Sequence, residues 1–565
     1  MSHRTFGLTL FALVSGAVCV HANEPATHID ISADSLSIGV DQDPAAANAI
    51  ARPVAAASCE ELQGLALPNV TISTAQAVRA GEATAIPEVI AQAKSTPMFA
   101  FMPNLAKAPV FCRIVGYIQP TPDSDIRFEV WMPQSGWNGK FQGLAEGGLA
   151  GIIDYANLTT SLNRGYAAAS TDTGHKGMMA TEWGFNHPEK IKDYHYRGMH
   201  LTAVASKSII RAFYGTLPRR SYLSGCSNGG RQGLIEAQRF AEDYDGILAG
   251  APARVVPDIA RVLWMSQKWR NSDTALSPQK LMVLHDAAIK TCDKRDGIAD
   301  GIISDPLSCH FDPSVLLCKG AQTDYCLTQP QLETARDVYA GLTDSDGKSL
   351  HNGQSPGTEL SWVSTFEAVF TIAESWYQDL VYNDRTWTAD KFNLKRDLES
   401  LIRITGSDAG DGDPDLSAFR ARGGKLIIYH GLSDASSPPA GAVGYYRSVQ
   451  DKMSPRAAAS VVSLFLIPGM AHCGGGDGPN DFNRGDGVDA SSNPNADMSA
   501  ALENWVEKGV EPQKIIASQY NPAAEFYGRA PNAALVRTRL ICAYPKVARW
   551  IRKGSADDAA NFVCE

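Results

Sequence analysis

Short apolar segments alternate with segments of helical periodicity between residues 126 and 250, and this alternation constrains the fold more than any other feature of the chain. Segments of the first kind are five or six residues long and are bounded by turn residues, which is typical of strands. Segments of the second kind carry apolar residues three and four positions apart, which is typical of helices with one buried side. Strands that alternate with helices predict parallel βαβ units in an open sheet. The predicted strands are 126–130, 140–145, 166–170, 219–224 and 245–250, and the predicted helices are 199–214 and 233–240.

The alternation stops after Pro252 and resumes near residue 423. Between these points the chain is rich in cysteine, aspartate and tryptophan and shows no regular order of strands and helices. A length of 565 residues also exceeds what one hydrophobic core usually organises. We therefore expect an α/β core formed by 23–254 and 416–565, with a lid domain inserted at 255–415. After the insertion we expect a strand at 423–430, a helix at 443–449, a strand at 461–467 and a last helix bearing Leu502, Trp505 and Val506 on one face.

The N-terminus has the order of a secretory signal peptide. A basic start is followed by an apolar run from Phe6 to Val20 and by small Ala22, after which cleavage is expected. The alternative is a short buried helix or a membrane anchor, but about 15 apolar residues fall short of the roughly 20 that span a bilayer. The sequence thus predicts that 1–22 are removed and that the protein is secreted or periplasmic.

Eleven cysteines less Cys19, which leaves with the signal peptide, make ten in the exported chain. An even number in an exported protein predicts disulfides, here five. No CxxC pair is present, which disfavours a zinc ribbon or a thioredoxin-like site. The sequence does not determine the connectivity, but three pairings would close short loops and leave four cysteines over. The short pairs are Cys292 with Cys309, Cys318 with Cys326 and Cys542 with Cys564, and the remainder are Cys59, Cys112, Cys226 and Cys473.

The stretch 225–229 reads GCSNG and fits the G-x-S-x-G pattern, in which a sharp turn from strand to helix presents a serine hydroxyl. By itself the pattern is weak, because roughly 0.3 matches are expected by chance in a chain of this composition. Its position between a predicted strand and a predicted helix strengthens it. Ser227 is therefore a candidate nucleophile, and the alternative is a glycine-rich turn with an inert serine.

A serine nucleophile needs a histidine to take its proton and a carboxylate to orient that histidine. In this type of fold the chain order is serine, acid, histidine. Asp434 lies in the turn just beyond the strand predicted at 423–430, and His472 is the single histidine after it. Asp434 and His472 are the candidate acid and base; the alternatives are a turn-capping aspartate and a surface histidine.

Two cysteines adjoin these candidates: Cys226 precedes Ser227, and Cys473 follows His472. If they pair, their Cα atoms lie within about 7 Å, which would bring the serine and the histidine together. The alternative is that either cysteine pairs elsewhere, although Cys59 with Cys112 and the three short loops would leave these two as the remainder.

Acyl transfer also requires amide donors for the developing oxyanion. The amide of Asn228, directly after the serine, is one candidate. The loop 146–151 reads EGGLAG after a predicted strand, and Gly148 and Ala150 are the candidates for the second donor. The alternative is that this loop is only a tight turn.

Three aspartates at close spacing mark the segment 293–302, DKRDGIADGI. Hard oxygen ligands at this density suit Ca²⁺, with backbone carbonyls turned inward near the glycines. The segment is no EF-hand, because Ser304 stands where the bidentate glutamate would be. The alternative is a solvated acidic turn. The expected ligands are Asp293, Asp296 and Asp300 with the carbonyls of Ile298 and Ile302.

Four motifs together resemble the tannase and feruloyl esterase family: STDTGH at 170–175, GCSNGG at 225–230, the CD-x-x-DG-x-x-DG loop ending at Gly301, and YHGLSD at 429–434. The resemblance covers most of the mature chain. It implies an α/β-hydrolase core, a disulfide between Cys226 and Cys473, a lid that binds Ca²⁺, and hydrolysis of aromatic carboxylic esters such as feruloyl or galloyl esters.

The chain also resembles the member of that family that hydrolyses mono(2-hydroxyethyl) terephthalate. The stretch 373–376, AESW, is similar to its lid, but Glu374 stands where that enzyme has an arginine that grips the substrate carboxylate. A carboxylate there would repel an anionic substrate, which favours neutral phenolic esters. Glu374 and Trp376 are accordingly the candidate substrate contacts.

The sequence predicts a serine carboxylesterase that acts on a small aromatic ester through an acyl-enzyme. The net charge of −10 provides no basic surface for nucleic acid or an anionic membrane. Within the same chemistry the alternatives are a terephthalate monoester hydrolase, a lipase or a peptidase. From a different class, the alternative is a calcium-stabilised binding protein with a vestigial elbow.

Overall fold

The computed structural model describes residues 56–95, 105–343, 349–406, 412–483, 493–521 and 533–565. The predicted signal peptide lies outside these residues. Within them, no helix combines the length and the apolar character that crossing a bilayer requires.

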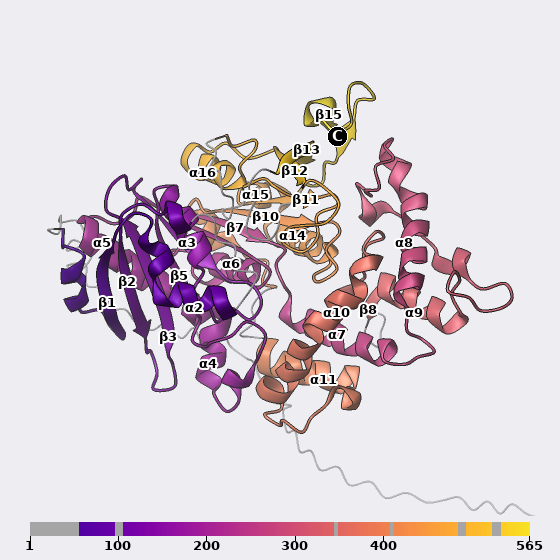
Figure 1. Ribbon diagram of the computed structural model, residues 1–565, viewed down its shortest axis with the longest axis horizontal. Coiled ribbons are helices and arrows are strands. Elements are labelled where there is room, and N and C mark those ends of the chain that lie inside the picture. Colours follow the sequence, from indigo (N-terminus) through magenta and orange to yellow (C-terminus); the bar gives the residue numbers. More distant parts are fainter. Residues whose placement is uncertain (1–55, 96–104, 344–348, 407–411, 484–492, 522–532) are drawn as a thin grey trace, which may run out of the picture. The chain divides into compact units, whose positions relative to one another are not determined.

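A nine-stranded sheet is the centre of the structure (Figure 1). In spatial order its strands are β1 (Val70–Val78), β2 (Phe111–Ile118), β3 (Ile126–Pro133), β5 (Ala167–Thr171), β4 (Lys140–Ala145), β6 (Arg220–Cys226), β7 (Gly246–Gly250), β10 (Lys425–Gly431) and β11 (Val462–Ile467). From β5 to β11 all neighbours are parallel, as the alternation of strands and helices predicts. At the other edge β1, β2 and β3 are antiparallel, and the sequence patterns did not reveal β1 and β2. Only 119–125 connect β2 to β3, which is too short for a crossover helix and forces antiparallel pairing.

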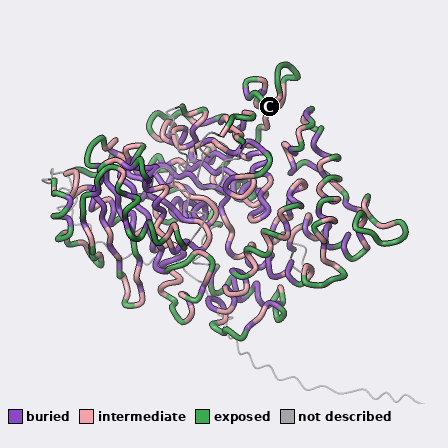
Figure 2. Tube along the Cα trace, in the orientation of Figure 1, coloured by how far each residue is buried: buried purple, intermediate pink, exposed green. Residues whose placement is uncertain are grey.

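Helices cover both faces of the sheet. Alternate residues of a strand face opposite layers. Leu223 packs with the helices at 198–214, 228–239 and 440–453, and Tyr222 packs with the helix at 498–508. Buried residues accordingly follow the strands (Figure 2). This is the α/β-hydrolase arrangement, and it confirms the predicted fold class. The first layer contains α5 (Gly198–Tyr214), α6 (Asn228–Arg239) and α14 (Ala440–Met453) with the short α13 (Ser417–Ala421) and α15 (Pro455–Ala459), and the second contains α2 (Pro87–Ser95), α3 (Tyr155–Asn163) and α16 (Met498–Lys508).

The chain between β7 and β10 adds no strand to the large sheet among its described residues. Because β10 pairs directly with β7, this stretch leaves the sheet and returns beside the strand that it left. The predicted lid at 255–415 falls inside it, and its helices lie together far from β1 (Figure 1). Its elements include α7 (Val255–Trp269), α8 (Pro278–Cys292), α9 (Gln329–Ala340), β8 (Gly341–Thr343), β9 (Ser349–Asn352), α10 (Trp362–Ser375) and α11 (Leu394–Leu401). The short helix α4 (Pro188–Lys192) is not part of this stretch and lies between β5 and α5.

Two antiparallel strand pairs follow α16, and neither was predicted from the sequence. They are β12 (Lys514–Asn521) with β13 (Ala534–Cys542), and β14 (Ala548–Trp550) with β15 (Phe562–Cys564). Ile515 and Ile541 of the first pair pack against the sheet in the layer of α16. The same pair brings Arg537 and Arg539 to the acidic loop of the insertion.

Candidate active site

Ser227 occupies the turn between β6 and α6. Its backbone angles are φ 63° and ψ −120°, a strained combination for a residue with a side chain. The surroundings tolerate no Cβ at the flanking glycines: one at Gly225 would lie 2.6 Å from the Ala145 Cβ, and one at Gly229 would lie 2.5 Å from the Ala145 carbonyl oxygen. The close packing of β6 and α6 against Ala145 explains the glycines of the motif and holds the serine at the end of the strand. α6 begins at Asn228, five residues before the helix predicted from Gly233.

Asp434 and His472 are joined at the ends of β10 and β11. His472 Nδ1 lies 2.7 Å from Asp434 Oδ2. Asp434 is fully buried, and its Oδ1 accepts hydrogen bonds from the amides of Ser436 and Ser437 at 2.8 and 3.0 Å. With Nδ1 donating to this fixed carboxylate, Nε2 is left as the proton acceptor of the ring.

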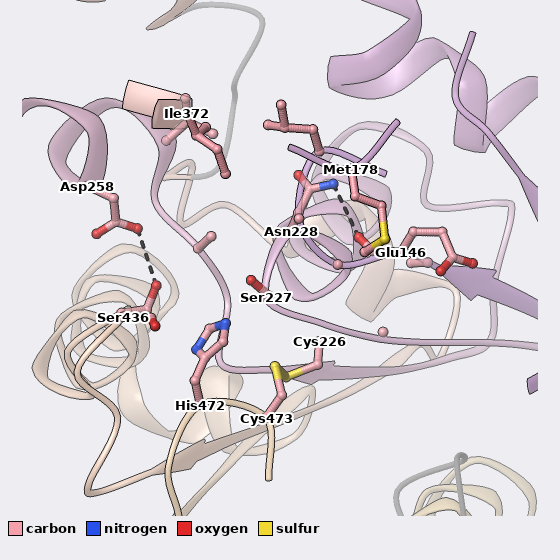
Figure 3. Close-up of a pocket in the computed structure, with 18 of the residues that line it drawn as sticks. Glu146, Met178, Cys226, Ser227, Asn228, Asp258, Ile372, Ser436, His472 and Cys473 are labelled. Atoms are coloured by element: carbon pink, nitrogen blue, oxygen red, sulfur yellow. Dashed lines mark hydrogen bonds between the residues drawn. A yellow bond between two sulfur atoms is a disulfide. The ribbon is translucent and has the colours of Figure 1, made fainter. Parts of the chain in front are cut away.

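The imidazole of His472 faces Ser227 across the pocket (Figure 3). No hydrogen bond joins the two side chains among the described residues; in the absence of substrate, catalytic hydrogen bonds are often long and shorten in the complex. The disulfide between Cys226 and Cys473, with 5.9 Å between its Cα atoms, ties the two loops together. The structure therefore brings all three candidate triad residues to one place.

The other eight described cysteines also form disulfides. All three pairings expected from short loops are present, and so is the pair left over with Cys226 and Cys473. These disulfides are Cys59–Cys112, Cys292–Cys309, Cys318–Cys326 and Cys542–Cys564.

Burial and charge act in opposite directions on the acid and the base. Burial alone would raise the pKa of Asp434, but the charge of His472 and hydrogen bonds from His430 and His472 hold that pKa well below its usual value. For His472, burial alone would lower the pKa, but Asp434 and, more weakly, Asp258 keep it above the usual value. The carboxylate is thus charged near neutral pH and favours the protonated form of the imidazole.

The three candidate oxyanion donors differ in their surroundings. Asn228 and Gly148 line the pocket next to Ser227. Gly148 has φ +61°, and a Cβ there would lie 2.8 Å from the Met178 carbonyl oxygen. The Ala150 amide instead donates to Gly147 within the loop at 3.0 Å, and Ala150 is not a lining residue. Our expectation for Ala150 is therefore corrected: Gly148, with its neighbour Gly147, is the part of the loop that faces the serine.

The Asn228 side chain connects this loop to two residues, Tyr194 and Arg231, that the sequence analysis did not identify. Its Nδ2 donates to the Glu146 carbonyl at 3.2 Å, and its Oδ1 accepts from Tyr194 at 3.1 Å and from Arg231 at 2.9 Å. Arg231 is itself fully buried, with its guanidinium over the Tyr194 ring. This network fixes the position of the turn at 225–229 relative to the loop at 146–151. No sequence pattern indicated this network, because Tyr194 lies outside every motif.

The triad opens into a cavity of about 350 Å³, within the size range of small-molecule sites. Much of its wall is apolar and aromatic, from residues such as Leu149, Ile372 and Trp376. Three acidic residues, Glu146, Asp154 and Asp258, also line it, and none of its described lining residues is a lysine or an arginine. An anionic substrate would meet the negative charge of Asp258 there, and no lysine or arginine of the described wall would compensate it.

The two candidate substrate contacts in the lid separate. Trp376 lines the cavity. Glu374 does not, because its carboxylate turns to the short helix η12 (Ala389–Lys391) and accepts from the Ala389 amide at 2.8 Å. The expectation that Glu374 faces the substrate is wrong, and the negative character of the pocket comes from other residues.

The acidic loop 293–302 lies at the end of α8. Asp293 accepts weak hydrogen bonds from the amides of Asp300 and Gly301, and Asp300 accepts from Arg537 and Arg539 of β13 at 3.2 and 2.6 Å. Among the described residues no three acidic, histidine or cysteine side chains are gathered as metal ligands. The side chains as positioned do not form a calcium cage, because Asp300 is paired with cations. Calcium binding at this loop stays a prediction.

Comparison with known proteins agrees with this geometry. The family model for tannase and feruloyl esterase matches residues 112–565. An uncharacterized esterase of Xanthomonas campestris pv. campestris is 36% identical over 90% of this chain and 91% of its own length. A probable feruloyl esterase B-2 of Aspergillus terreus is 31% identical over 80% of this chain and 86% of its own.

Solved structures show the same relationship. The crystal structure of feruloyl esterase B from Aspergillus oryzae has a TM-score of 0.80 and 29% identity, covering 90% of this chain and 99% of that one. The tannin acyl hydrolase from Aspergillus niger, at 21% identity and a TM-score of 0.68 over 90% of this chain and 94% of that one, shares the fold. This chain, with its α/β-hydrolase fold, belongs to the tannase and feruloyl esterase family.

Proposed function

We propose that this protein is a secreted serine esterase that hydrolyses neutral aromatic carboxylic esters, of the feruloyl or galloyl kind, through an acyl-enzyme. The observation that carries the proposal is the Asp434–His472 pair facing Ser227 in an apolar cavity, with the Cys226–Cys473 disulfide behind them. Five disulfides are in keeping with an oxidising compartment.

In the first half of the reaction Ser227 Oγ attacks the ester carbonyl carbon, and His472 Nε2 takes the hydroxyl proton. The amides of Asn228 and the 147–148 loop donate to the oxyanion of the tetrahedral intermediate. When the intermediate collapses, the alcohol leaves with the proton from His472, and the acyl group stays on the serine. In the second half, water gives its proton to His472 and attacks the acyl-enzyme, and the carboxylic acid departs with Ser227 restored.

The charge of the pocket supports neutral esters over terephthalate monoesters. A substrate carboxylate would lie near Asp154 or Asp258 in a cavity whose described wall contains no lysine or arginine. Like charges at short range repel, most strongly where water is excluded. The apolar wall with Trp376 and Tyr194 suits an aromatic ring.

The test is turnover of methyl ferulate, methyl gallate and a terephthalate monoester by the wild type and by Ser227→Ala. We expect hydrolysis of at least one of the two phenolic esters in preference to the terephthalate ester, and a loss of at least about a thousandfold in kcat on removing the hydroxyl. The thermal melt of Ser227→Ala serves as the folding control. Equal turnover by the folded variant and the wild type would refute the serine mechanism, and a preference for the terephthalate ester would refute the substrate class.

A further inference from the structure

The catalytic cavity has two different ends. In Figure 3, Ile372 and Asp258 of the insertion lie on one side of Ser227, and Glu146 and Met178 lie on the other. The insertion also contributes the apolar side chains of Val262, Val369 and Trp376 to the cavity wall. The second end is formed where β4 leads into α3, and its lining includes the side chains or backbone of Glu146, Asp154 and Asn157. The mechanism described above uses only the carbonyl of Glu146, as the acceptor for Asn228.

The Glu146 carboxyl is buried yet incompletely paired. The residue is 3% exposed. Its Oε1 accepts a hydrogen bond from Ser170 Oγ at 3.0 Å, and that hydroxyl in turn accepts from the Asp154 amide at 2.9 Å. Oε2 has no hydrogen-bond partner among the described residues. The protein does not enclose this oxygen completely, so part of it remains accessible. Because buried polar atoms are nearly always satisfied, an oxygen left open toward a cavity is a position for a ligand atom.

The environment of this carboxyl favours its neutral form. Burial and the nearby charge of Asp154 raise the pKa of Glu146 well above the usual value, against the opposing effect of the Ser170 hydrogen bond. Asp154 is held in place by Asn157, whose amide and Nδ2 donate to it at 2.9 and 2.6 Å. A protonated carboxyl both donates and accepts a hydrogen bond, and so does a hydroxyl group. A carboxylate only accepts and would meet Asp154, and an ether oxygen accepts but cannot donate.

We propose that Glu146 forms a subsite that recognises a hydroxyl group of the ester substrate. The inference rests on the proposed esterase function and adds a requirement to it: the preferred aromatic ester carries a free hydroxyl at the end that reaches Glu146. That hydroxyl belongs either to the phenol of the acyl group or to the alcohol part. Glu146 is a specificity-determining residue in this scheme, because it contacts the substrate away from the reacting carbonyl.

Two matched pairs of esters test the subsite and distinguish its two sources. The acyl pair is methyl ferulate and methyl dimethoxycinnamate, which differ in the phenolic hydroxyl. The alcohol pair is the hydroxyethyl and propyl esters of dimethoxycinnamate, which are equal in length. We expect the wild type to prefer the hydroxylated member of one pair by about tenfold or more in kcat/KM, since a site built to bind a hydroxyl rejects analogues without it. Glu146→Leu should abolish that preference, and Glu146→Gln, whose amide donates and accepts, should retain most of it.

The ratio within each pair separates recognition from a purely structural role. If Glu146→Leu lowers kcat/KM equally for both members and leaves the wild-type preference intact, the subsite is refuted. Absence of any preference in the wild type refutes it too, and this measurement does not depend on whether a variant folds. Failure of the wild type to hydrolyse any of the four esters or methyl gallate would instead refute the proposed function itself.

Discussion

Removing the disulfide between Cys226 and Cys473 should cost both stability and activity, because it constrains the unfolded chain and also joins the two catalytic loops. The bridge closes a loop of 247 residues. Loop-closure entropy of that length corresponds to about 5.5 kcal/mol at 25 °C in the chain-entropy model. Unfolding entropy of roughly 2.1 cal/mol/K per residue over 565 residues converts this to a decrease in Tm of about 5 °C.

A matched control is the disulfide between Cys318 and Cys326, which closes a loop of eight residues away from the cavity. The same model gives about 2.5 kcal/mol, or about 2 °C, for its removal. We expect the paired alanine variant at 318 and 326 to keep kcat/KM within about twofold of the wild type. The paired alanine variant at 226 and 473 should lose about tenfold or more, because misplacement of a catalytic group by about 1 Å can cost a hundredfold.

The measurements are thermal melts by circular dichroism and ester hydrolysis by the fraction that remains folded. Both double variants carry two cysteine-to-alanine changes, so the loss of two sulfur atoms is common to them. If removing the long-range bridge lowers Tm no more than removing the short one and leaves kcat/KM unchanged, the disulfide does not hold the triad together, and the reasoning is refuted.

Two further predictions concern pH and calcium. Because the pKa of His472 is raised and the base must be neutral, kcat/KM should fall as the pH drops through a value above about 6.5. Asp258→Asn removes one nearby negative charge and should move this fall in kcat/KM to lower pH. An unchanged pH profile of the variant would contradict the assignment of His472 as the base. If the 293–302 loop binds Ca²⁺, excess EGTA should lower Tm and change kcat much less, because removing calcium at a hundredfold excess over Kd costs about 2.7 kcal/mol of folding free energy. Asp293→Asn should reduce the difference between melts with calcium and with EGTA. Identical melts of the wild type under the two conditions would exclude the site.

Much of the fold and the triad could be read from local patterns. The strand predicted at 140–145 coincides with β4, and the helix predicted at 199–214 differs from α5 by one residue. Each pattern repeats with the period of a strand or helix and is bounded by turn residues, so it depends on neighbours in the chain. The antiparallel edge strands β1 and β2 escaped this reading, since their partners are set by pairing across the sheet rather than by periodicity.

The sequence by itself determined the candidate catalytic groups: a serine in a strand-to-helix elbow, an aspartate after the first buried strand that follows the insertion, and one histidine downstream of it. Parallel strands place their carboxyl ends at one edge of a sheet. Residues just beyond those ends therefore lie close together, and this does not depend on how the rest of the chain folds. Tertiary structure decided what each loop and lid side chain faces. Ala150 gives its amide to its own loop, Glu374 turns to a neighbouring helix, and Glu146 accepts a hydrogen bond from Ser170. These orientations depend on contacts between distant segments, such as Glu146 with Ser170, because a loop has no repeating period from which the direction of a side chain could be read.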